Sequence, residues 1–525
     1  MRTLSRRHFI GGTAASVTGF TLLTRGQAAV AARQATPSAS PVAAASVIST
    51  TALDDLRSRL KGTLLLPGDC GYNAASEPAN GRYNDIRPAA IARVADEDDV
   101  VTCIQWCTEN GVDPVGRGGG HSYAGFSTTT GLMIDLRRLN HVVVDKSQGT
   151  ATCGGAALNN DYFIATEDGP LFLPGGTCLG VGVGGLTLGG GIGYNAHWAG
   201  LTCDHMIHSR IVTADAQVRE ISPSSEEDLY WACRGGAGGS FGINTEFTFT
   251  MVEVPQQEVS FYRYEWMGAD AAVEAMQVFH QVLASAPQAL NAVVMTEATD
   301  NDADPHKALH TMTRGAYIGP VDELADLIAP LTAIGNKTVD SLQPMMFWDI
   351  QRMIATQEPE QHNFGDMSRY ANEVPADNLL ADVVELIAEC PQRSDDANGS
   401  FWSLGWVGGK VGEFSRTDTA YVHRDALTLL RPTTVWPDGS PDSVGDELNA
   451  WTQSVIDLIS PSTPDESYQN FPNRDLERYL TQYYAENLDR LVDVKTAVDP
   501  NNMFNNPQSV PTRDGLAAMG GLDRV

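Results

Sequence analysis

Two glycine-rich segments restrict what this chain can fold into more than any other feature. The first, residues 114–127, reads PVGRGGGHSYAGFS. Consecutive glycines let several backbone N–H groups converge on one anion, because no Cβ blocks close approach or a positive φ. We interpret this segment as a cradle for a pyrophosphate, with Arg117 adding positive charge. A tight turn with an incidental histidine is the alternative interpretation.

The second segment, residues 174–204, reads PGGTCLGVGVGGLTLGGGIGYNAHWAGLTCD. Gly180, Gly182 and Gly185 satisfy G-x-G-x-x-G, with Asp204 further along, as in a nicotinamide-binding Rossmann fold. That fingerprint has to open a helix, and we predict that GGLTLGGGIG is too rich in glycine to form one. We expect these glycines instead to let the backbone lie flat against a large planar ligand. A pyrophosphate joined to a broad ring system indicates FAD.

Length and charge restrict the class of protein. The chain has 525 residues, which predicts two domains with appendages. It carries 35 basic and 65 acidic side chains, a formal net charge of −30. This excess of negative charge argues against nucleic acid or an anionic membrane as a partner.

The N-terminus has the features of an export signal. Arg6 and Arg7 precede a short, weakly apolar run that ends in small residues. This pattern is typical of a twin-arginine signal peptide, here residues 1–32, with a disordered basic tail as the alternative. Residues 33–50 read as a disordered linker rich in Pro, Ala and Ser. No apolar run of about 20 residues follows, so we expect no membrane span and an exported protein, secreted or on the cell-envelope side.

The chain has eight cysteines, and export permits disulfides. Cys103 and Cys107 lie one turn apart in a predicted helix over residues 96–110, which Gly111 ends. A metal site would need two more ligands at a suitable spacing, and we find none, so we expect no metal. We interpret the pair as core thiols, or one of them as the disulfide partner of Cys70.

The rest of the pattern is α+β. Between residues 83 and 255, short apolar strands alternate with glycine-rich turns. From about residue 256, strands such as FYRYEW alternate with amphipathic helices such as AAVEAMQVFHQVLAS, which predicts an antiparallel sheet with helices on one face. The last predicted helix runs through RDLERYLTQYYAENLDRLVDVKTAVDP, and Asp499-Pro500 ends it.

Five motifs follow one another along the chain: GRGGGHSYAGFS, GGTCLGVGVGGLTLGGGIG, GLTCD, YWACRGGAGGSFGINTEF and VKTAVDPNNMFNNPQSV. Together they closely resemble the berberine-bridge-enzyme-like FAD-linked oxidases of the vanillyl-alcohol-oxidase superfamily. The resemblance implies a two-subdomain PCMH-type FAD-binding domain, an inserted substrate domain made of an antiparallel sheet and helices, and a C-terminal segment that returns to the FAD domain. The limits we predict are 51–255, 256–467 and 468–525.

The resemblance also gives a role to the histidine that ends the first glycine run. In this family the histidine of GGHSY bonds covalently to a methyl of the flavin ring, which places that role on His121. Many members have a second bond from the cysteine of G-x-C, and Cys178 holds that position. Two bonds would fix FAD and raise its reduction potential. The other implied FAD contacts are Arg117, Gly118, Gly119, Gly120, Ser122, Val181, Gly185, Gly190, Gly191, Leu201, Asp204, Val212 and Gln508.

The implied reaction takes a hydride from a C–H bond while a base removes the proton from the substrate oxygen. Tyr468 in YQNF matches the base of the carbohydrate- and alcohol-oxidising branch, and Tyr123 would assist. A phenol with a pKa of about 10 has to be lowered to act at neutral pH, by a cation or a hydrogen-bond donor. We expect Arg424 or Arg474 to supply it. Val181 holds the position where a small residue leaves access for oxygen, which favours an oxidase that forms hydrogen peroxide.

The substrate is less restricted by the sequence. The tryptophans of the second domain suit sugar rings or flat polycyclic metabolites, although such residues usually belong to a core. We favour oxidation of a carbohydrate hemiacetal, with a secondary-metabolite alcohol as the alternative. Two rival functions stay open: a dehydrogenase of the same fold that uses an acceptor other than oxygen, and a flavin-binding protein without turnover.

Overall fold

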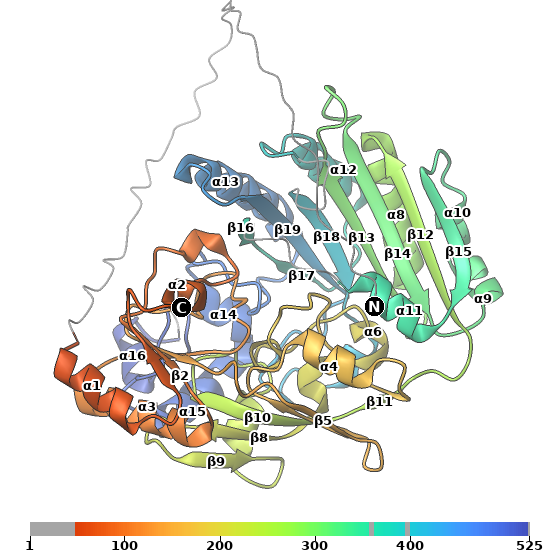
Figure 1. Ribbon diagram of the computed structural model, residues 1–525. Coiled ribbons are helices and arrows are strands. Elements are labelled where there is room, and N and C mark those ends of the chain that lie inside the picture. Colours follow the sequence, from red (N-terminus) through yellow and green to blue (C-terminus); the bar gives the residue numbers. More distant parts are fainter. Residues whose placement is uncertain (1–47, 356–361, 394–399, 523–525) are drawn as a thin grey trace, which may run out of the picture. The chain divides into compact units, whose positions relative to one another are not determined.

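The computed structural model describes residues 48–355, 362–393 and 400–522 (Figure 1). The predicted signal peptide, residues 1–32, and linker residues 33–47 lie outside the described residues. Within the described part of the chain, no helix is both long and apolar enough to cross a membrane. Because Arg6 and Arg7 lie outside the described residues, the twin-arginine signal peptide stays a prediction from sequence.

Three small sheets form the N-terminal part. The elements are α1 (Thr50–Arg59), β1 (Thr63–Leu65), α2 (Tyr72–Ser76), β2 (Ala90–Arg93), α3 (Glu97–Asn110), β3 (Pro114–Arg117), β4 (Leu132–Asp135), β5 (Val142–Asp145), β6 (Thr150–Gly154), α4 (Asn159–Thr166), β7 (Leu171–Phe172), α5 (Val183–Leu188), α6 (Ala196–Ala199), β8 (Met206–Val212), β9 (Val218–Ile221), α7 (Glu227–Ala232), β10 (Ile243–Thr250) and β11 (Val252–Glu253). One sheet has the order β1-β2-β4-β3, with β2, β4 and β3 parallel, and the next is antiparallel with the order β5-β6-β10-β8-β9. β7 pairs with β11.

Helix α3 confirms the prediction over residues 96–110. The Asp96 carboxylate caps its start by accepting from the N–H of Asp99, and Gly111 ends it at a φ of 63°. That left-handed conformation favours glycine. Cys103 and Cys107 are buried core thiols outside any disulfide, and burial raises their pKa, while Cys70 is exposed. The core-thiol interpretation is therefore the correct one.

An eight-stranded antiparallel sheet forms the second part. Its elements are β12 (Val259–Met267), α8 (Ala269–Ala284), β13 (Leu290–Ala298), β14 (Leu309–Tyr317), α9 (Val321–Leu327), α10 (Ala329–Thr332), β15 (Val339–Met345), α11 (Phe347–Ile354), β16 (His362–Asp366), β17 (Arg369–Ala371), α12 (Asp377–Ala388), β18 (Phe401–Trp406), β19 (Thr428–Pro437) and α13 (Asp442–Ile459). The order is β15-β12-β14-β13-β18-β19-β16, and β17 also pairs with β19.

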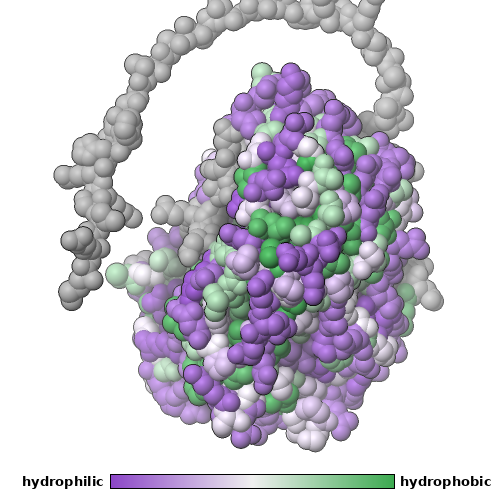
Figure 2. Space-filling view, turned by 90° about the vertical axis from the view of Figure 1, so that its right-hand side faces the viewer, coloured by the Kyte–Doolittle hydropathy of each residue, from purple (hydrophilic) through white to green (hydrophobic). Residues whose placement is uncertain are grey.

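The two faces of this sheet differ in chemistry because side chains alternate along a strand. In β12, the buried Tyr262, Tyr264 and Trp266 alternate with Arg263 and Glu265. Helices α8, α12 and α13 lie along one face of the sheet (Figure 1), and their buried residues share a core with Tyr262, Tyr264 and Trp266. The predicted antiparallel sheet with helices on one face is confirmed for α8, α12 and α13, while α11 packs against Val259 and Phe261 on the other face. Figure 2 shows the side of the molecule that carries β15, α9 and α10, where hydrophilic residues surround small groups of hydrophobic ones.

The C-terminal segment returns to the first part of the chain, as predicted. It contains α14 (Tyr479–Tyr484), α15 (Leu488–Val498) and α16 (Arg513–Ala518), and α14 and α15 share a hydrophobic core with β10. The prediction of one continuous helix was wrong, because the helix breaks at Ala485, which has a φ of 39°. The break lets the Asn487 amide donate to the carbonyl oxygens of Arg416 and Thr419, at 2.8 and 3.1 Å. The α+β fold class is confirmed, and the predicted domain limits stay predictions.

Candidate active site

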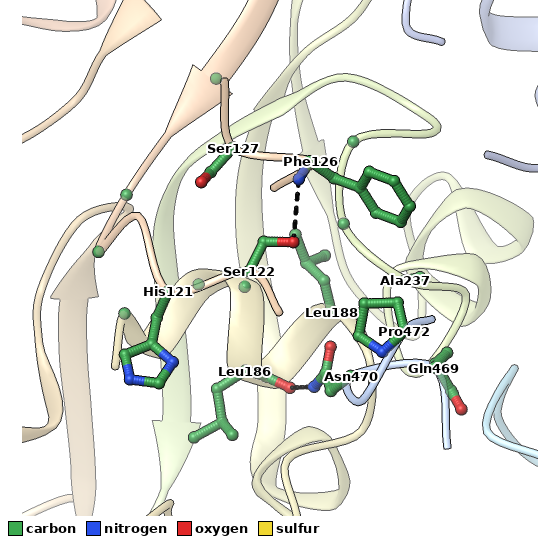
Figure 3. Close-up of a pocket in the computed structure, with 18 of the residues that line it drawn as sticks. His121, Ser122, Phe126, Ser127, Leu186, Leu188, Ala237, Gln469, Asn470 and Pro472 are labelled. Carbon is green, nitrogen blue, oxygen red and sulfur yellow. Dashed lines mark hydrogen bonds between the residues drawn. The ribbon is translucent and has the colours of Figure 1, made fainter. Parts of the chain in front are cut away.

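A cavity of about 320 Å³ lies where the two glycine segments, strand β19 and residues 468–472 meet. Figure 3 shows part of its wall, with the ring of His121 beside Leu186 and the amide of Asn470 turned toward the Leu186 carbonyl. The structure therefore brings together parts of the chain that lie far apart in sequence. The predicted site residues that line it are Gly118, Gly119, Gly120, His121, Ser122, Tyr123, Cys178, Val181, Gly185, Tyr468 and Gln508.

The two glycine segments contact each other. A Cβ on Gly119 would lie 2.5 Å from the backbone nitrogen of Gly182, and one on Gly182 would lie 2.6 Å from that of Gly119. Absent side chains here permit close packing of two backbones, not only contact with a ligand. Gly185 is different, because a Cβ at this position would have no neighbour within 4 Å. Only some of the glycines therefore fit the expectation of backbone lying open to a flat ligand.

The prediction that the second segment forms no helix was wrong. Helix α5 begins after Gly182 and contains Gly184 and Gly185. Intrinsic propensity disfavours such a helix by about 1 kcal/mol for each glycine, and tertiary packing overrides it. A Cβ on Gly184 would lie 2.7 Å from the Gly155 carbonyl oxygen, so this short helix can approach β10 and its neighbours only with glycine. The Rossmann interpretation still fails, because the sheets here are not a doubly wound parallel sheet.

Arg117 braces the first glycine segment from outside the cavity. Its guanidinium donates to the carbonyl oxygens of Ala75, Ser76 and Ser127 at 2.8, 3.1 and 2.8 Å. Burial lowers its pKa to about 10. In this structure, its charge joins α2 to the turn after β3 and does not face the cavity, in contrast to the sequence expectation.

Other predicted cofactor residues also lie behind the wall. The Asp204 carboxylate accepts from Leu201 N–H at 3.0 Å and forms a buried bidentate pair with Arg424 at 2.7 and 3.0 Å. Val212 is a buried residue of β8 whose cross-strand partner, Ile243, lines the cavity. Gly190 and Gly191 have positive φ values of 117° and 90° and pack against Tyr421 and Thr202.

Tyr468 lines the cavity and is the predicted catalytic base. Its side chain is buried, and its Oη accepts three hydrogen bonds of 3.1 Å from Gly191 N–H, Ile192 N–H and the Asn470 amide. Burial raises the pKa of Tyr468 to about 12, and the three donors act in the opposite direction. The predicted lowering is therefore not observed, and phenol is the resting form at neutral pH.

The cations expected beside Tyr468 are engaged elsewhere. Arg424 is paired with Asp204, and its guanidinium carbon lies 4.9 Å from the centre of the Tyr421 ring. Arg474 lies over the ring of Tyr83, at 4.5 Å. The groups that contact the phenol oxygen are backbone and amide N–H donors, which composition and spacing do not reveal.

Tyr123 belongs to an aromatic cluster at the junction of the two parts. Its ring lies 4.7 Å from that of Phe364 on β16, 5.3 Å from that of Phe471 and 5.8 Å from that of His121. The Tyr123 hydroxyl accepts from Arg431 at 2.9 Å. The predicted tether residue and the proposed assisting tyrosine therefore meet the inserted sheet directly.

Arg431 is the functional candidate that sequence reasoning missed. It lies on β19, lines the cavity and pairs with Asp366 of β16, whose side chain is fully buried. Among the described residues that line the cavity, Arg431 is the one with a permanently charged side chain, and none carries a carboxylate. The only signal in the sequence is a charged residue inside the apolar run LTLLRPTTVW.

This lining fits an anionic dinucleotide with a planar ring. It has glycine backbone at 118–120 and at Gly182, Gly184 and Gly185 for phosphate groups. Gly185 is an open position, and no described lining residue has a carboxylate to repel phosphate. Phe126, Phe247 and Phe504 supply apolar surface. The donor set thus agrees with FAD.

Comparison with known proteins gives the same assignment. The FAD binding domain family matches residues 88–222, and the berberine and berberine-like family matches residues 467–511. The FAD-linked oxidoreductase YgaK of Bacillus subtilis is 31% identical over 464 residues, covering 87% of this chain and 98% of that protein. Glucooligosaccharide oxidase of Sarocladium strictum is 29% identical over 462 residues, covering 81% and 88%. The solved structure of xylooligosaccharide oxidase from Myceliophthora thermophila with xylobiose superimposes with a TM-score of 0.76 at 25% identity, covering 88% and 99%.

Proposed function

Because this chain belongs to the berberine-bridge-enzyme-like family of FAD-linked oxidoreductases, we propose that it is an oxidase acting on an alcohol or hemiacetal carbon of a saccharide. Relatives named glucooligosaccharide and xylooligosaccharide oxidase support the saccharide class. The observation that carries the proposal is a buried phenol oxygen with three N–H donors, in the same cavity as His121 and Cys178. When bound, FAD would accept a hydride from the substrate carbon and pass the electrons to oxygen, forming hydrogen peroxide.

In this proposal, Tyr468 removes the proton of the substrate hydroxyl. A neutral phenol oxygen carries its own proton and can accept two hydrogen bonds well, so three donors around Tyr468 stabilise the phenolate in preference to the phenol. Burial opposes this and keeps the pKa at about 12. The base form is therefore scarce at neutral pH, and the rate should rise with pH. Tyr123 would orient the substrate through the hydroxyl that Arg431 already contacts.

The substrate and the acceptor are tested together. We would supply the purified protein with cello-, xylo- and chito-oligosaccharides and record oxygen uptake and hydrogen peroxide. Equal amounts of both, with the lactone or aldonic acid as product, are expected. Flavin that bleaches with saccharide and recovers slowly in air but rapidly with a quinone would support a dehydrogenase. Flavin that no saccharide and no secondary-metabolite alcohol reduces would support a binding protein without turnover.

We also propose that FAD is held by two covalent bonds, from His121 and Cys178, because both residues line the same cavity. Acid denaturation should leave the yellow colour on the polypeptide. His121→Ala and Cys178→Ala should each retain one bond, and the double variant should release its flavin. Release of all flavin from the wild-type protein would refute the attachment and leave the oxidase proposal intact. Export by the twin-arginine pathway stays a proposal from the sequence of residues 1–32.

A further inference from the structure

We propose that Arg431 determines substrate specificity by binding a carboxylate, so that the preferred substrate is an acidic saccharide of the uronate class. This inference rests on the proposed function and adds a substrate class to it. Its starting point is charge: among the described residues that line the cavity, no other side chain is permanently charged. A solitary cation in a largely apolar wall is costly unless a partner compensates it.

The compensating partner lies behind Arg431, away from the cavity. Arg431 Nε donates to Asp366 Oδ2 at 2.6 Å, and Thr433 Oγ1 donates to the same oxygen at 3.1 Å. The Asp366 side chain is fully buried and is not part of the cavity wall, whereas that of Arg431 is 19% exposed. The pair thus presents its positive end to the cavity.

The guanidinium is fixed in one orientation. Besides the bond to Asp366, Nη2 donates to Tyr123 Oη at 2.9 Å, and the guanidinium carbon lies 3.9 Å from the centre of the Phe471 ring. The third nitrogen, Nη1, has no hydrogen-bond partner among the described residues. A guanidinium held in one orientation, with the N–H groups of Nη1 available as donors, is suited to a carboxylate. The planar fork of arginine matches the two oxygens of a carboxylate.

The origin of Arg431 favours the substrate over the cofactor as its ligand. The glycine segments that fit phosphate belong to the N-terminal part, whereas Arg431 comes from the inserted sheet. Its cross-strand partner is Ser403, and the register continues through Met295 and Met312 to Glu265. Arg431 therefore belongs to the face of the sheet that carries Arg263 and Glu265, opposite the face that α8, α12 and α13 cover.

Arg431 and the proposed base lie on the two sides of one aromatic ring. Phe471 separates the two groups, since its ring lies 5.0 Å from that of Tyr468 and packs under the guanidinium of Arg431. In a hexopyranose the ring oxygen joins C1 to C5, which carries C6, so a sugar whose anomeric hydroxyl meets Tyr468 would direct a C6 carboxylate past Phe471 to Arg431. Glucose and glucuronic acid differ at that carbon, C6, by a hydroxymethyl against a carboxylate.

A binding experiment tests the inference without turnover. Methyl β-D-glucuronide and methyl β-D-glucoside both lack a free anomeric hydroxyl, so neither can be oxidised there. Calorimetric titration of the flavin-loaded protein should show tighter binding of the glucuronide by at least about tenfold, as expected for a charge-assisted pair. Arg431→Gln should reduce the preference to within about twofold, and Arg431→Lys should keep part of it, because it keeps the charge but not the fork.

Removing one partner of a buried pair can destabilise the fold, so a second variant is needed. The double variant Arg431→Gln/Asp366→Asn replaces the pair with two neutral amides of similar size. It should melt near the wild-type temperature, retain its flavin and lose the preference. Equal binding of the two glycosides by the wild type, binding of neither, a preference that survives in the double variant, or a folded double variant without flavin would each overturn the inference.

Failure of the proposed function would look different. In that case glucose and glucuronic acid, which have a free anomeric hydroxyl, would both leave the flavin oxidised while the wild type still bound the methyl glucuronide preferentially. The acidic binding site would then stand without the oxidase chemistry.

Discussion

The cavity has two walls that are built on different principles. The wall from the N-terminal part includes the backbone of Gly118–Gly120 and of Gly182, Gly184 and Gly185, and the two segments touch at Gly119 and Gly182 without side chains between them. The wall from the inserted sheet is made of side chains, with Arg431 paired to Asp366 and packed on aromatic rings. The glycine wall offers its backbone to a ligand, whereas the sheet wall offers side chains, which can be changed one at a time.

This difference separates the tasks of the two parts. Backbone geometry suits a cofactor that stays the same, because a side chain added at Gly119 or Gly182 disturbs the packing of two segments at once. A sheet face suits a substrate, because alternate residues can change without moving the strand. Tyr468 lies where the walls meet and takes donors from the N-terminal part, at Gly191 and Ile192.

The largest effect is expected at this meeting point. Tyr468→Phe removes the proposed base and should lower kcat about 10²- to 10⁴-fold with flavin retained. In the wild type, kcat/KM should rise with pH through the neutral and alkaline range, because the pKa of Tyr468 is raised to about 12 and the phenolate is the active form. Steady-state kinetics from neutral to alkaline pH would measure both. A variant within tenfold of the wild type would remove Tyr468 from the chemistry.

The next effect tests the ion pair with Arg416 and the hydrogen bond from His423 that hold the segment before Tyr468. Burial by itself would raise the pKa of Glu466, but bonds from His423 at 2.6 Å and Arg416 at 2.7 Å hold it at about 2. A lowered carboxyl pKa stabilises the fold above the unfolded pKa, and this stabilisation is lost as the pH falls toward the folded one. Glu466→Gln should therefore lower the unfolding free energy near pH 7 by about 1–3 kcal/mol, the range for hydrogen bonds to a charged group.

Urea unfolding at several pH values measures this cost. The difference in unfolding free energy between the wild type and Glu466→Gln should become smaller as the pH falls below about 4. Glu477→Gln, at an exposed position, is the matched control and should have little effect. A gap that stays constant with pH would show that packing, and not the charge of Glu466, holds this segment.

The glycine wall is tested by a matched pair of alanines. Gly119→Ala places a Cβ 2.5 Å from the backbone nitrogen of Gly182 and should cost about 1–3 kcal/mol by overpacking. A Cβ at Gly185, which lies in helix α5, would have no neighbour within 4 Å. The melting temperature of the Gly185→Ala variant should therefore equal or exceed that of the wild type. Thermal melting and flavin content would be compared. Equal destabilisation by both variants would contradict the idea that the two loops need each other's backbone.

The smallest expected effect concerns one donor to Tyr468. Asn470→Ala removes a hydrogen bond of 3.1 Å to the phenol oxygen and leaves those from Gly191 and Ile192. We expect the pH profile of kcat/KM to shift toward higher pH, so that kcat/KM near neutral pH falls about tenfold. An unchanged pH profile would show that the two backbone donors suffice.

Sequence reasoning succeeded where local pattern decides structure. Helix α3 has an acidic cap and a terminal glycine, and β12 alternates aromatic and charged residues, so both could be read directly. It failed at α5, where burial and close packing outweigh the poor helix propensity of glycine, and at Ala485, where Asn487 finds partners in a distant segment. In both failures the deciding contacts lie far away along the chain.

The same division holds in the site. The sequence alone determined the family and the segments of its FAD-binding domain, and it pointed to His121, Cys178 and Tyr468 as candidate site residues. Ordered motifs carry this information locally. Only the tertiary structure decided that the expected cations serve other partners, that backbone N–H groups surround Tyr468, and that Arg431 enters the cavity from the sheet. The physical reason is that a hydrogen bond or an ion pair depends on distance in space, which residues 191 and 468 acquire only when the chain folds.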